Sequence, residues 1–335
     1  MSGFQEITID DEIADIRMGR PHVVILGAGA SRAVCPNGDR NGRKLPLMAD
    51  FAECPGISDL LENWGIDPAQ NFETTYSGLH DAGETAKLEQ LNKLVERYFI
   101  SLELPDHPTI YDHLVMSLRG QDLIATFNWD PLLLQAYVRN HRRLSMPRLV
   151  FLHGNVRTGY CETDRAMGLA GHECRKCGLP FKRTPLLYPV ANKDYAANPA
   201  IAWEWEALHE GIHSAFMITI FGYSCPRTDQ AARDAMQAAW GPVAHREMEQ
   251  TAFITLQADD EIRSSWREFI HTHHFEVQTD FYDSWIAKHP RRTGEAYLSQ
   301  YIDAHFVTDN PIPRDLDLDA TSNWFERFLD AEQRD

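Results

Sequence analysis

The sequence predicts an α/β fold built on a doubly wound, Rossmann-like parallel sheet, and three observations support this prediction. Short apolar runs alternate with helical segments along the chain, which is the pattern of successive βαβ units. The first run, 23–26, stops abruptly at Gly27-Ala28-Gly29-Ala30-Ser31, as a buried strand does where it turns into a phosphate-binding helix. Three later runs also end on glycine or polar residues, and in such sheets ligands bind beyond these strand ends.

The other elements follow in order from apolar periodicity and turn residues. Strands are expected at 23–26, 122–127, 148–152, 216–221, 252–256 and 275–278. Helices are expected at 10–18, 85–102, 201–215, 228–240 and 322–331. Residues 35–46 are dense in Gly, Pro, Asn and Asp, and a long loop directly after a phosphate-binding turn predicts a lid over the ligand.

These elements divide the chain into a main domain with two insertions and an extension. The main domain is expected to comprise 1–158 and 215–289, with a helical insertion at 48–120. A small inserted module at 159–214 carries a cysteine cluster, and 290–335 form the C-terminal extension.

The composition is that of an ordinary soluble globular protein, with 335 residues of which 43% are hydrophobic and 24% charged. No stretch approaches the ~20 apolar residues of a membrane span, and no secretory signal is visible, so we expect a cytoplasmic protein without membrane contact. The formal net charge of −17 argues against direct nucleic-acid binding, which depends on Lys and Arg. Two small basic pairs, Arg142-Arg143 and Arg291-Arg292, are expected to be solvated surface.

Four strand ends are expected to converge on one crevice, because the carboxyl ends of parallel strands meet at one edge of the sheet. They carry Gly27–Ser31, Asn128-Trp129-Asp130, His153-Gly154-Asn155 and Gly222-Tyr223-Ser224. Structural alternatives stay open. Asn128 and Asp130 also suit the cap of a helix that begins at Pro131, and His153 is also interpretable as a structural histidine.

In this order, the motifs resemble those of the sirtuin family over about residues 20–280. The matching motifs are Gly27–Ser31, Thr126-Phe127-Asn128-Trp129-Asp130, His153-Gly154 and Gly222-Tyr223-Ser224. The resemblance implies NAD as the bound nucleotide. It also implies roles for the motif residues. Gly27, Ala28, Gly29 and Ser31 would contact the pyrophosphate and the adjacent ribose, and Gly222 and Ser224 would lie at the phosphate and adenosine side. Asn128 and Asp130 would lie around nicotinamide and its ribose, and His153 would be the catalytic base.

The residue types suit cleavage of the nicotinamide–ribose bond independently of the resemblance. This cleavage gives an oxocarbenium-like centre, as in glycoside hydrolysis, and nicotinamide leaves as a neutral molecule. The amide of Asn128 is able to orient a water or a ribose hydroxyl. A histidine such as His153 supplies a base that titrates near neutral pH. Asn128 and His153 are therefore the predicted catalytic residues.

A cysteine cluster follows the His153 motif, with Cys161 separated by twelve residues from Cys174-Arg175-Lys176-Cys177. Sirtuins carry two Cys-x-x-Cys pairs for structural zinc in this interval. Here the first pair is reduced to Cys161, and His172 is a candidate fourth ligand. A zinc site formed by Cys161, His172, Cys174 and Cys177 and a metal-free remnant are the two alternatives.

Two segments depart from the pattern of protein-deacylating sirtuins. Pro189 interrupts the segment 186–194, beside which an acylated peptide would pair as a strand. The loop 35–48 also differs from the sequence usual in the family. These departures resemble a divergent bacterial branch whose members hydrolyse NAD in antiviral defence.

The sequence therefore predicts an NAD glycohydrolase that releases nicotinamide and ADP-ribose as a regulated antiphage-defence effector. An NAD-dependent protein deacylase and a catalytically silent NAD-binding sensor are the alternatives. The resemblance also implies regulation by a partner. We expect a homo-oligomer, or assembly with a HerA-type ATPase or another defence sensor such as an Argonaute-like or nucleotide-sensing domain.

Overall fold

The computed structural model describes residues 6–141, 144–190, 193–225, 229–246, 248–270 and 275–333. Its centre is a six-stranded sheet in the order β10-β9-β8-β2-β3-β4, in which every neighbouring pair is parallel. The strands are β2 (His22–Leu26), β3 (Leu123–Thr126), β4 (Arg148–Phe151), β8 (Met217–Phe221), β9 (Gln250–Ile254) and β10 (Phe275–Gln278). The predicted α/β class and all six predicted strands are confirmed.

The strand order places a topological switch point between β2 and β8. From β2 the chain moves outward to β3 and β4, then returns to the other side of β2 for β8, β9 and β10. This is the order of a dinucleotide-binding Rossmann sheet, whose ligand crevice lies where the direction reverses. Strand β9 ends two residues before its predicted boundary, and Leu256, which the prediction placed in the strand, is 88% exposed.

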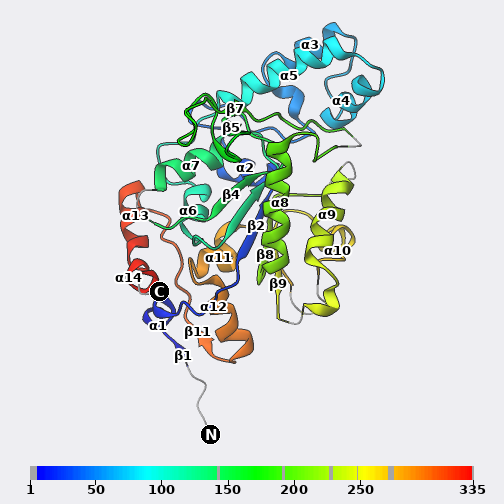
Figure 1. Ribbon diagram of the computed structural model, residues 1–335. Helices are drawn as coiled ribbons and strands as arrows, with labels where there is room; N and C mark the ends of the chain where they lie inside the picture. Colours follow the sequence, from blue (N-terminus) through cyan, green and yellow to red (C-terminus); the bar gives the residue numbers. More distant parts are fainter. Residues whose placement is uncertain are drawn as a thin grey trace.

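Helices cover both faces of the sheet (Figure 1). Along β2, Val24 and Leu26 enter one apolar core, while Val23 and Ile25 enter the other, as the alternation of a strand requires. The helices of the first face are α2 (Ala28–Val34), α6 (Ile110–Met116), α7 (Leu132–Asn140) and α11 (Trp285–Lys288). The second face is covered by α8 (Pro199–Ser214), α9 (Gln230–Trp240) and α10 (Asp259–Ser265).

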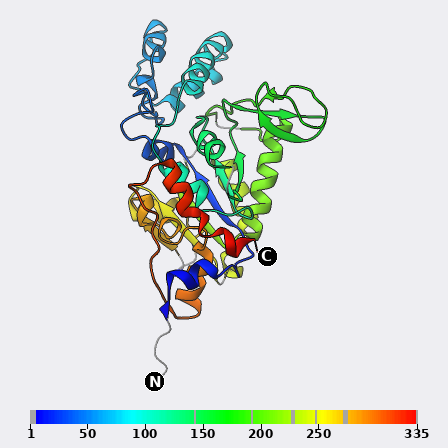
Figure 2. The same cartoon turned by 90° about the vertical axis from the view of Figure 1, so that its left-hand side faces the viewer.

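Two additions project from the end of the molecule opposite β1 and α1 (Figures 1 and 2). The first contains η1 (Phe51–Glu53), α3 (Ile57–Asn63), α4 (Phe72–Asp81) and α5 (Thr85–Ile100). The second is a three-stranded antiparallel sheet of β5 (Thr158–Cys161), β6 (Ala166–Leu169) and β7 (Lys182–Arg183). Residues 184–198, which we call the strap, lead from β7 back to α8.

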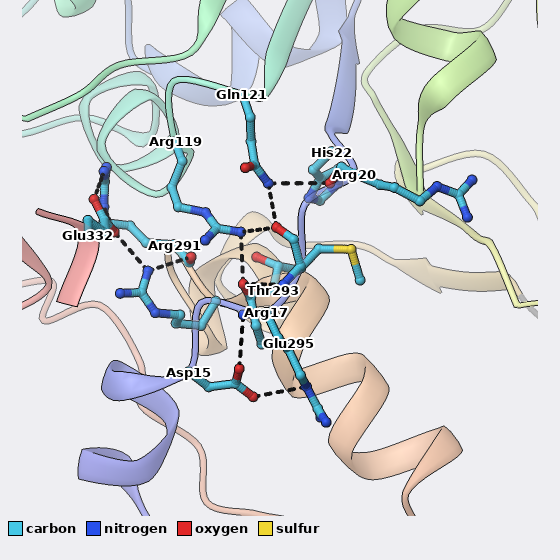
Figure 3. Close-up of polar contacts among 12 residues, drawn as sticks. Asp15, Arg17, Arg20, His22, Arg119, Gln121, Arg291, Thr293, Glu295 and Glu332 are labelled. Carbon is cyan, nitrogen blue, oxygen red and sulfur yellow. Dashed lines mark hydrogen bonds and ion pairs between the residues drawn. The ribbon is translucent and has the colours of Figure 1, made fainter. Parts of the chain in front are cut away.

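The terminal segments pack together at the amino ends of the strands. They comprise β1 (Glu6–Ile7), α1 (Ile9–Ala14), α12 (Thr293–Tyr297), η5 (Leu298–Ile302), β11 (Phe306–Val307), α13 (Leu318–Glu326) and α14 (Leu329–Glu332). Two short elements lie elsewhere, η3 (Val243–His245) between α9 and β9 and η4 (Phe281–Asp283) between β10 and α11. Strands β1 and β11 pair in parallel. Figure 3 shows Arg119 and Gln121 reaching across this end, Arg119 to Glu295 at 2.8 Å and Gln121 to the Met18 carbonyl at 2.8 Å.

The expectation that Arg291 and Arg292 are solvated surface is wrong. Both side chains are fully buried, with 0% exposure, and Glu332 binds both of them. The separations are 2.5 Å from Arg291 Nη2 and 2.7 Å from Arg292 Nη1. Backbone carbonyls, among them those of Met116 and Ile13, also accept hydrogen bonds from the two guanidinium groups, so that both buried charges are paired and hydrogen-bonded. The other basic pair, Arg142-Arg143, lies outside the described residues.

Two predicted helices are shorter or divided in the structure. The first, at 10–18, ends at Ala14, where Asp15 adopts extended backbone. The last, at 322–331, is divided into α13 and α14. Among the described residues, no helix is both long enough and apolar enough to span a bilayer.

Candidate active site

One large cavity, of about 920 Å³, opens at the switch point of the sheet. Its walls come from the ends of β2, β3, β4, β8 and β9, from the loop after α2, from α4 and from the strap. The strand-end residues predicted to bind nucleotide all line it: Gly27, Ala28, Gly29, Ser31, Asn128, Asp130, His153, Gly222 and Ser224. Ligand sites of drug-like molecules occupy about 300–1,000 Å³, so this cavity has the size of a cofactor site.

The two glycine turns pack backbone against backbone. The Gly29 N–H donates to the Gly222 carbonyl at 2.9 Å. A Cβ on Gly27 would lie 2.5 Å from the Gly222 carbonyl oxygen, and one on Gly222, whose φ is +62°, would lie 2.1 Å from the Ala30 nitrogen. Neither approach accommodates a side chain. Glycine is thus required here so that the two strand ends meet.

A hydrogen-bonded cluster joins the end of β3 to the first glycine turn. Asn128 Nδ2 donates to the Gly27 carbonyl at 2.8 Å and to Ser31 Oγ at 2.9 Å. Ser31 Oγ in turn donates to Asp130 Oδ2 at 2.7 Å, and the Tyr111 hydroxyl lies 2.8 Å from the same Oγ. Burial raises the pKa of the Asp130 carboxyl, opposed by its hydrogen bond from Ser31.

The capping alternative also applies to Asp130. Its Oδ1 accepts the Leu132 N–H at 3.0 Å, at the first residue of α7, so this carboxylate both starts the helix and binds Ser31. For Asn128, the contacts join the glycine turn to β3 and do not cap α7. The two residues therefore differ in their local roles, although both line the cavity.

His153 lies buried just beyond β4, between two aromatic rings. Phe127 meets it edge-on with centroids 4.8 Å apart, and Tyr195 stacks over it at 6.0 Å. Its Nε2 is buried and has no hydrogen-bond partner among the described residues. Burial lowers the pKa of His153 to about 4, so the imidazole is neutral at pH 7. This differs from the base of near-neutral pKa that the sequence suggested.

Sequence reasoning missed four polar residues of the cavity. Lys193, from the strap, forms an ion pair with Asp229 before α9, and their side chains are only 3% and 7% exposed. The Tyr223 hydroxyl donates to the other oxygen of Asp229 at 3.0 Å. Glu73 of α4 also lines the cavity. Tyr223 lies in the predicted Gly222–Ser224 motif but had no assigned role. The other three belong to no recognisable motif, because tertiary packing alone brings them to the strand ends.

The predicted lid lies over the cavity, where Pro36 and residues 45–49 line it. Arg32, which occupies the place of the third glycine of a dinucleotide fingerprint, holds this loop. Its Nε donates to the Leu45 carbonyl at 2.7 Å, and its guanidinium pairs with Asp50. Arg32 thus replaces the third glycine of the Gly-x-Gly-x-x-Gly pattern and also holds the lid in place through these two contacts.

The three clustered cysteines come together in the small module with an acidic fourth group. Cys161, Asp164, Cys174 and Cys177 place their ligand atoms within 4.8 Å of one another. Cys161 Sγ lies 3.4 Å from Cys177 Sγ, and Cys174 Sγ lies 3.2 Å from Asp164 Oδ2. Tetrahedral zinc with Zn–S bonds of about 2.3 Å holds its sulfurs about 3.8 Å apart, so this set fits zinc.

The proposed fourth ligand needs correction. His172 is exposed and is not a member of this group. Asp164 takes its place, because the tight turn between β5 and β6 brings the residue three positions after Cys161 to the sulfurs. A search of the sequence for cysteine and histidine alone overlooks such a ligand.

Comparison with known proteins finds no matching family model and no matching curated protein. The similar solved structures are Sir2 proteins. They include a Sir2 homologue in complex with NAD (12% identity, 85% of this chain and 88% of that chain, TM-score 0.40), a mutant Sir2 homologue with 2′-O-acetyl ADP ribose (14%, 85% and 90%, 0.42), and a Sir2 protein with a deacetylated p53 peptide and 3′-O-acetyl ADP ribose (12%, 87% and 95%, 0.38).

These identities and TM-scores are low, and nothing about activity follows from them. The class of protein is defined by this chain's own features. A six-stranded parallel sheet in Rossmann order, four motif-bearing strand ends around one cavity and a cysteine module agree with the sirtuin-like fold predicted from the sequence.

Proposed function

We propose that the protein is an NAD glycohydrolase, which cleaves the nicotinamide–ribose bond and releases nicotinamide and ADP-ribose. The observation that carries this proposal is the convergence of the glycine turn 27–31, Asn128, Asp130 and His153 on one cavity of about 920 Å³ at the switch point of the sheet. A cavity at this place in a Rossmann sheet is where a dinucleotide binds.

The two glycine turns supply the binding surface for the pyrophosphate. Gly27, Gly29 and Gly222 line the cavity without side chains, so that phosphate oxygens approach the main chain closely in this proposal. Ser31, Asn128 and Asp130 then surround the nicotinamide ribose in this proposal. Their mutual hydrogen bonds hold the three side chains before a ligand enters, which reduces the entropy lost on binding.

Hydrolysis at this site requires an oriented water and a group that accepts its proton. Nicotinamide leaves neutral, so the departing group needs no strong acid. His153 is neutral at pH 7, and its buried Nε2 has no partner among the described residues, so the ring is free to accept a hydrogen bond from water or a ribose hydroxyl. Asn128 orients that nucleophile in the same proposal.

The strap favours hydrolysis over deacylation, the second candidate. An acylated peptide that pairs beside 186–194 would need open backbone and a channel to His153. Instead, the Leu187 N–H already donates to the His153 carbonyl at 2.9 Å, and Ser77 Oγ donates to the Pro189 carbonyl at 2.9 Å. The buried Lys193–Asp229 pair joins the strap to the residue that precedes α9.

Zinc in the small module would have a structural role. Cys161, Asp164, Cys174 and Cys177 would hold it, and a site with four protein ligands has no open position for substrate. The ion would join the β5–β6 turn to the Cys174–Cys177 turn. These turns precede the strap, so that the metal would stabilise the segment that crosses the cavity.

We further propose that the activity is controlled by assembly, as a homo-oligomer or with a HerA-type ATPase or another defence sensor. Uncontrolled NAD hydrolysis would harm the cell that makes the protein. Sedimentation of the purified chain with and without a candidate partner, combined with activity assays of each species, tests this dependence.

Incubation of the purified protein with NAD, alone and with candidate partners, followed by chromatography of the products, tests the proposed function. We expect nicotinamide and ADP-ribose in equal amounts. Transfer of an acyl group from an acylated peptide with formation of acyl-ADP-ribose would favour the deacylase. NAD binding without product under every condition would favour a silent sensor.

A further inference from the structure

Helix α4 brings a carboxyl group into the cavity from outside the Rossmann sheet. Asn71 accepts the Glu73 N–H at 2.9 Å and so begins the helix, and both side chains line the cavity. Glu73 and Ser77 are four residues apart and share one face of α4. Since Ser77 donates to the Pro189 carbonyl at 2.9 Å, this face lies against the strap.

The carboxyl group of Glu73 has an oxygen that the protein leaves unsatisfied. Oε1 is buried and has no hydrogen-bond partner among the described residues. Burial raises the pKa of Glu73, Asp229 raises it further and Lys193 opposes them. An unpaired buried carboxyl oxygen is unfavourable for folding, and in the wall of a ligand cavity a bound water or substrate is its natural partner.

Glu73 and His153 have the same charged neighbours. Asp229 raises the pKa of both Glu73 and His153. Lys193 lowers both pKa values. All four residues line the one cavity. Glu73 and His153 therefore line the same cavity, although they are 80 residues apart in sequence.

We propose that Glu73 is a catalytic residue, the general base for the water that attacks the ribose; this inference rests on the proposed glycohydrolase function. As the bond between nicotinamide and C1′ breaks, its electron pair leaves with nicotinamide and C1′ becomes oxocarbenium-like. The water oxygen bonds to C1′ and gives one proton to the Glu73 carboxylate. Glu73 then releases that proton to solvent, and ADP-ribose is formed.

A carboxylate suits this step better than the neutral imidazole. Glycoside hydrolases use Asp or Glu to activate water beside an oxocarbenium-like centre, and the negative charge also stabilises that centre. Burial raises the pKa of Glu73, and a carboxylate with a raised pKa is a stronger base than one in water. His153, whose pKa is about 4, is left to orient the nucleophile through Nε2.

The experiment compares Glu73→Gln and Glu73→Ala with Glu89→Gln, a matched change on the exposed side of α5. General-base catalysis contributes roughly 10²–10⁴-fold, so we expect Glu73→Gln to lower kcat for nicotinamide release by about that factor with little change in KM. Sodium formate should restore turnover to Glu73→Ala, because the small carboxylate fits the vacated space. It should not restore Asn128→Ala, and Glu89→Gln should behave as wild type.

The outcomes separate this inference from the proposed function. Absence of nicotinamide release from the wild-type protein overturns the proposed function and the inference with it. An active wild type together with an active Glu73→Gln, or with Glu73→Ala that formate fails to restore, overturns the inference alone. Calorimetric binding of ADP-ribose by each variant shows that its site is folded, and Glu73→Asp replaces any variant that fails this check.

Discussion

Asn128 Nδ2 donates a hydrogen bond to the carbonyl oxygen of Gly27 at 2.8 Å. The contact spans 101 residues of sequence and joins the end of β3 to the glycine turn after β2. The same amide reaches Ser31, so one side chain positions both the backbone turn and the polar group that follows it. The proposed orientation of the substrate and the local fold would thus depend on the same residue.

Replacement of Asn128 by alanine should therefore affect both activity and stability. We expect nicotinamide release to fall by at least about 100-fold, the usual contribution of a positioned catalytic group. The free energy of unfolding should fall by about 1–3 kcal/mol, because the buried Gly27 carbonyl loses its partner. Urea denaturation and a turnover assay measure the two effects. The control is Asn63→Ala, a change at an exposed residue of α3. Wild-type turnover in a folded Asn128→Ala protein would contradict the assigned role.

Stability should depend on pH through His153. The unfolded histidine takes up a proton near pH 6.5, whereas folded His153, whose pKa burial lowers to about 4, stays neutral. Between these pH values the unfolded state binds more protons than the folded state. The free energy of unfolding is therefore highest near pH 7 with respect to His153, and it decreases as pH falls from about 6.5 toward 4. The full effect is up to about 3 kcal/mol.

Urea denaturation of wild type and His153→Gln at pH 7 and pH 5 measures this contribution. His22 and His113, whose pKa values burial lowers to about 3 and about 4, add to the wild-type slope in the same direction. The difference between the two proteins isolates His153. We expect His153→Gln to lose less stability than wild type between these pH values, while exposed His209→Gln matches wild type. Equal losses in wild type and His153→Gln would show that His153 is not a buried neutral group.

The small module should bind one zinc ion per chain through Asp164. Elemental analysis of the purified protein is expected to give that ratio, and a chelator should lower the melting temperature. Asp164→Asn should reduce the zinc content, whereas His172→Ala should retain it. Loss of zinc from His172→Ala with full retention in Asp164→Asn would restore the ligand set expected from the sequence.

Glu332 should be important for stability although it lies far from the cavity. It binds the two fully buried guanidinium groups of Arg291 and Arg292. Removal of one partner from a buried ion pair leaves an uncompensated charge and costs about 3–5 kcal/mol. Thermal and urea denaturation of Glu332→Gln should show a loss of this size, and exposed Asp330→Asn should show little. An effect of Glu332→Gln as small as that of Asp330→Asn would mean that solvent reaches these arginines.

Much of the fold is predictable from local patterns. A strand such as 23–26 is apolar throughout because both faces of the sheet are covered, and glycine and polar residues mark its end. The motif residues from Gly27 to Ser224 could be assembled into one site because parallel strands share an edge. The end of β9 was less predictable, since Leu256 is apolar in type and yet exposed.

Features that depend on distant packing could not be predicted in this way. Glu73, Lys193 and Asp229 lie in three unrelated segments, and only the arrangement of α4 and the strap brings them to the cavity. The burial of Arg291 depends on Glu332, 41 residues further along the chain. In each case a charged residue in an irregular or helical segment is expected to be exposed, because the sequence does not identify the partner that allows its burial.

The most direct test of the account is chromatography of the products formed from NAD by the wild-type protein and by Asn128→Ala, each with and without candidate partners. The account predicts nicotinamide and ADP-ribose in equal amounts from wild type under at least one condition, and unchanged NAD from Asn128→Ala. Intact NAD in every wild-type reaction, or equal product from the Asn128→Ala protein, would contradict it.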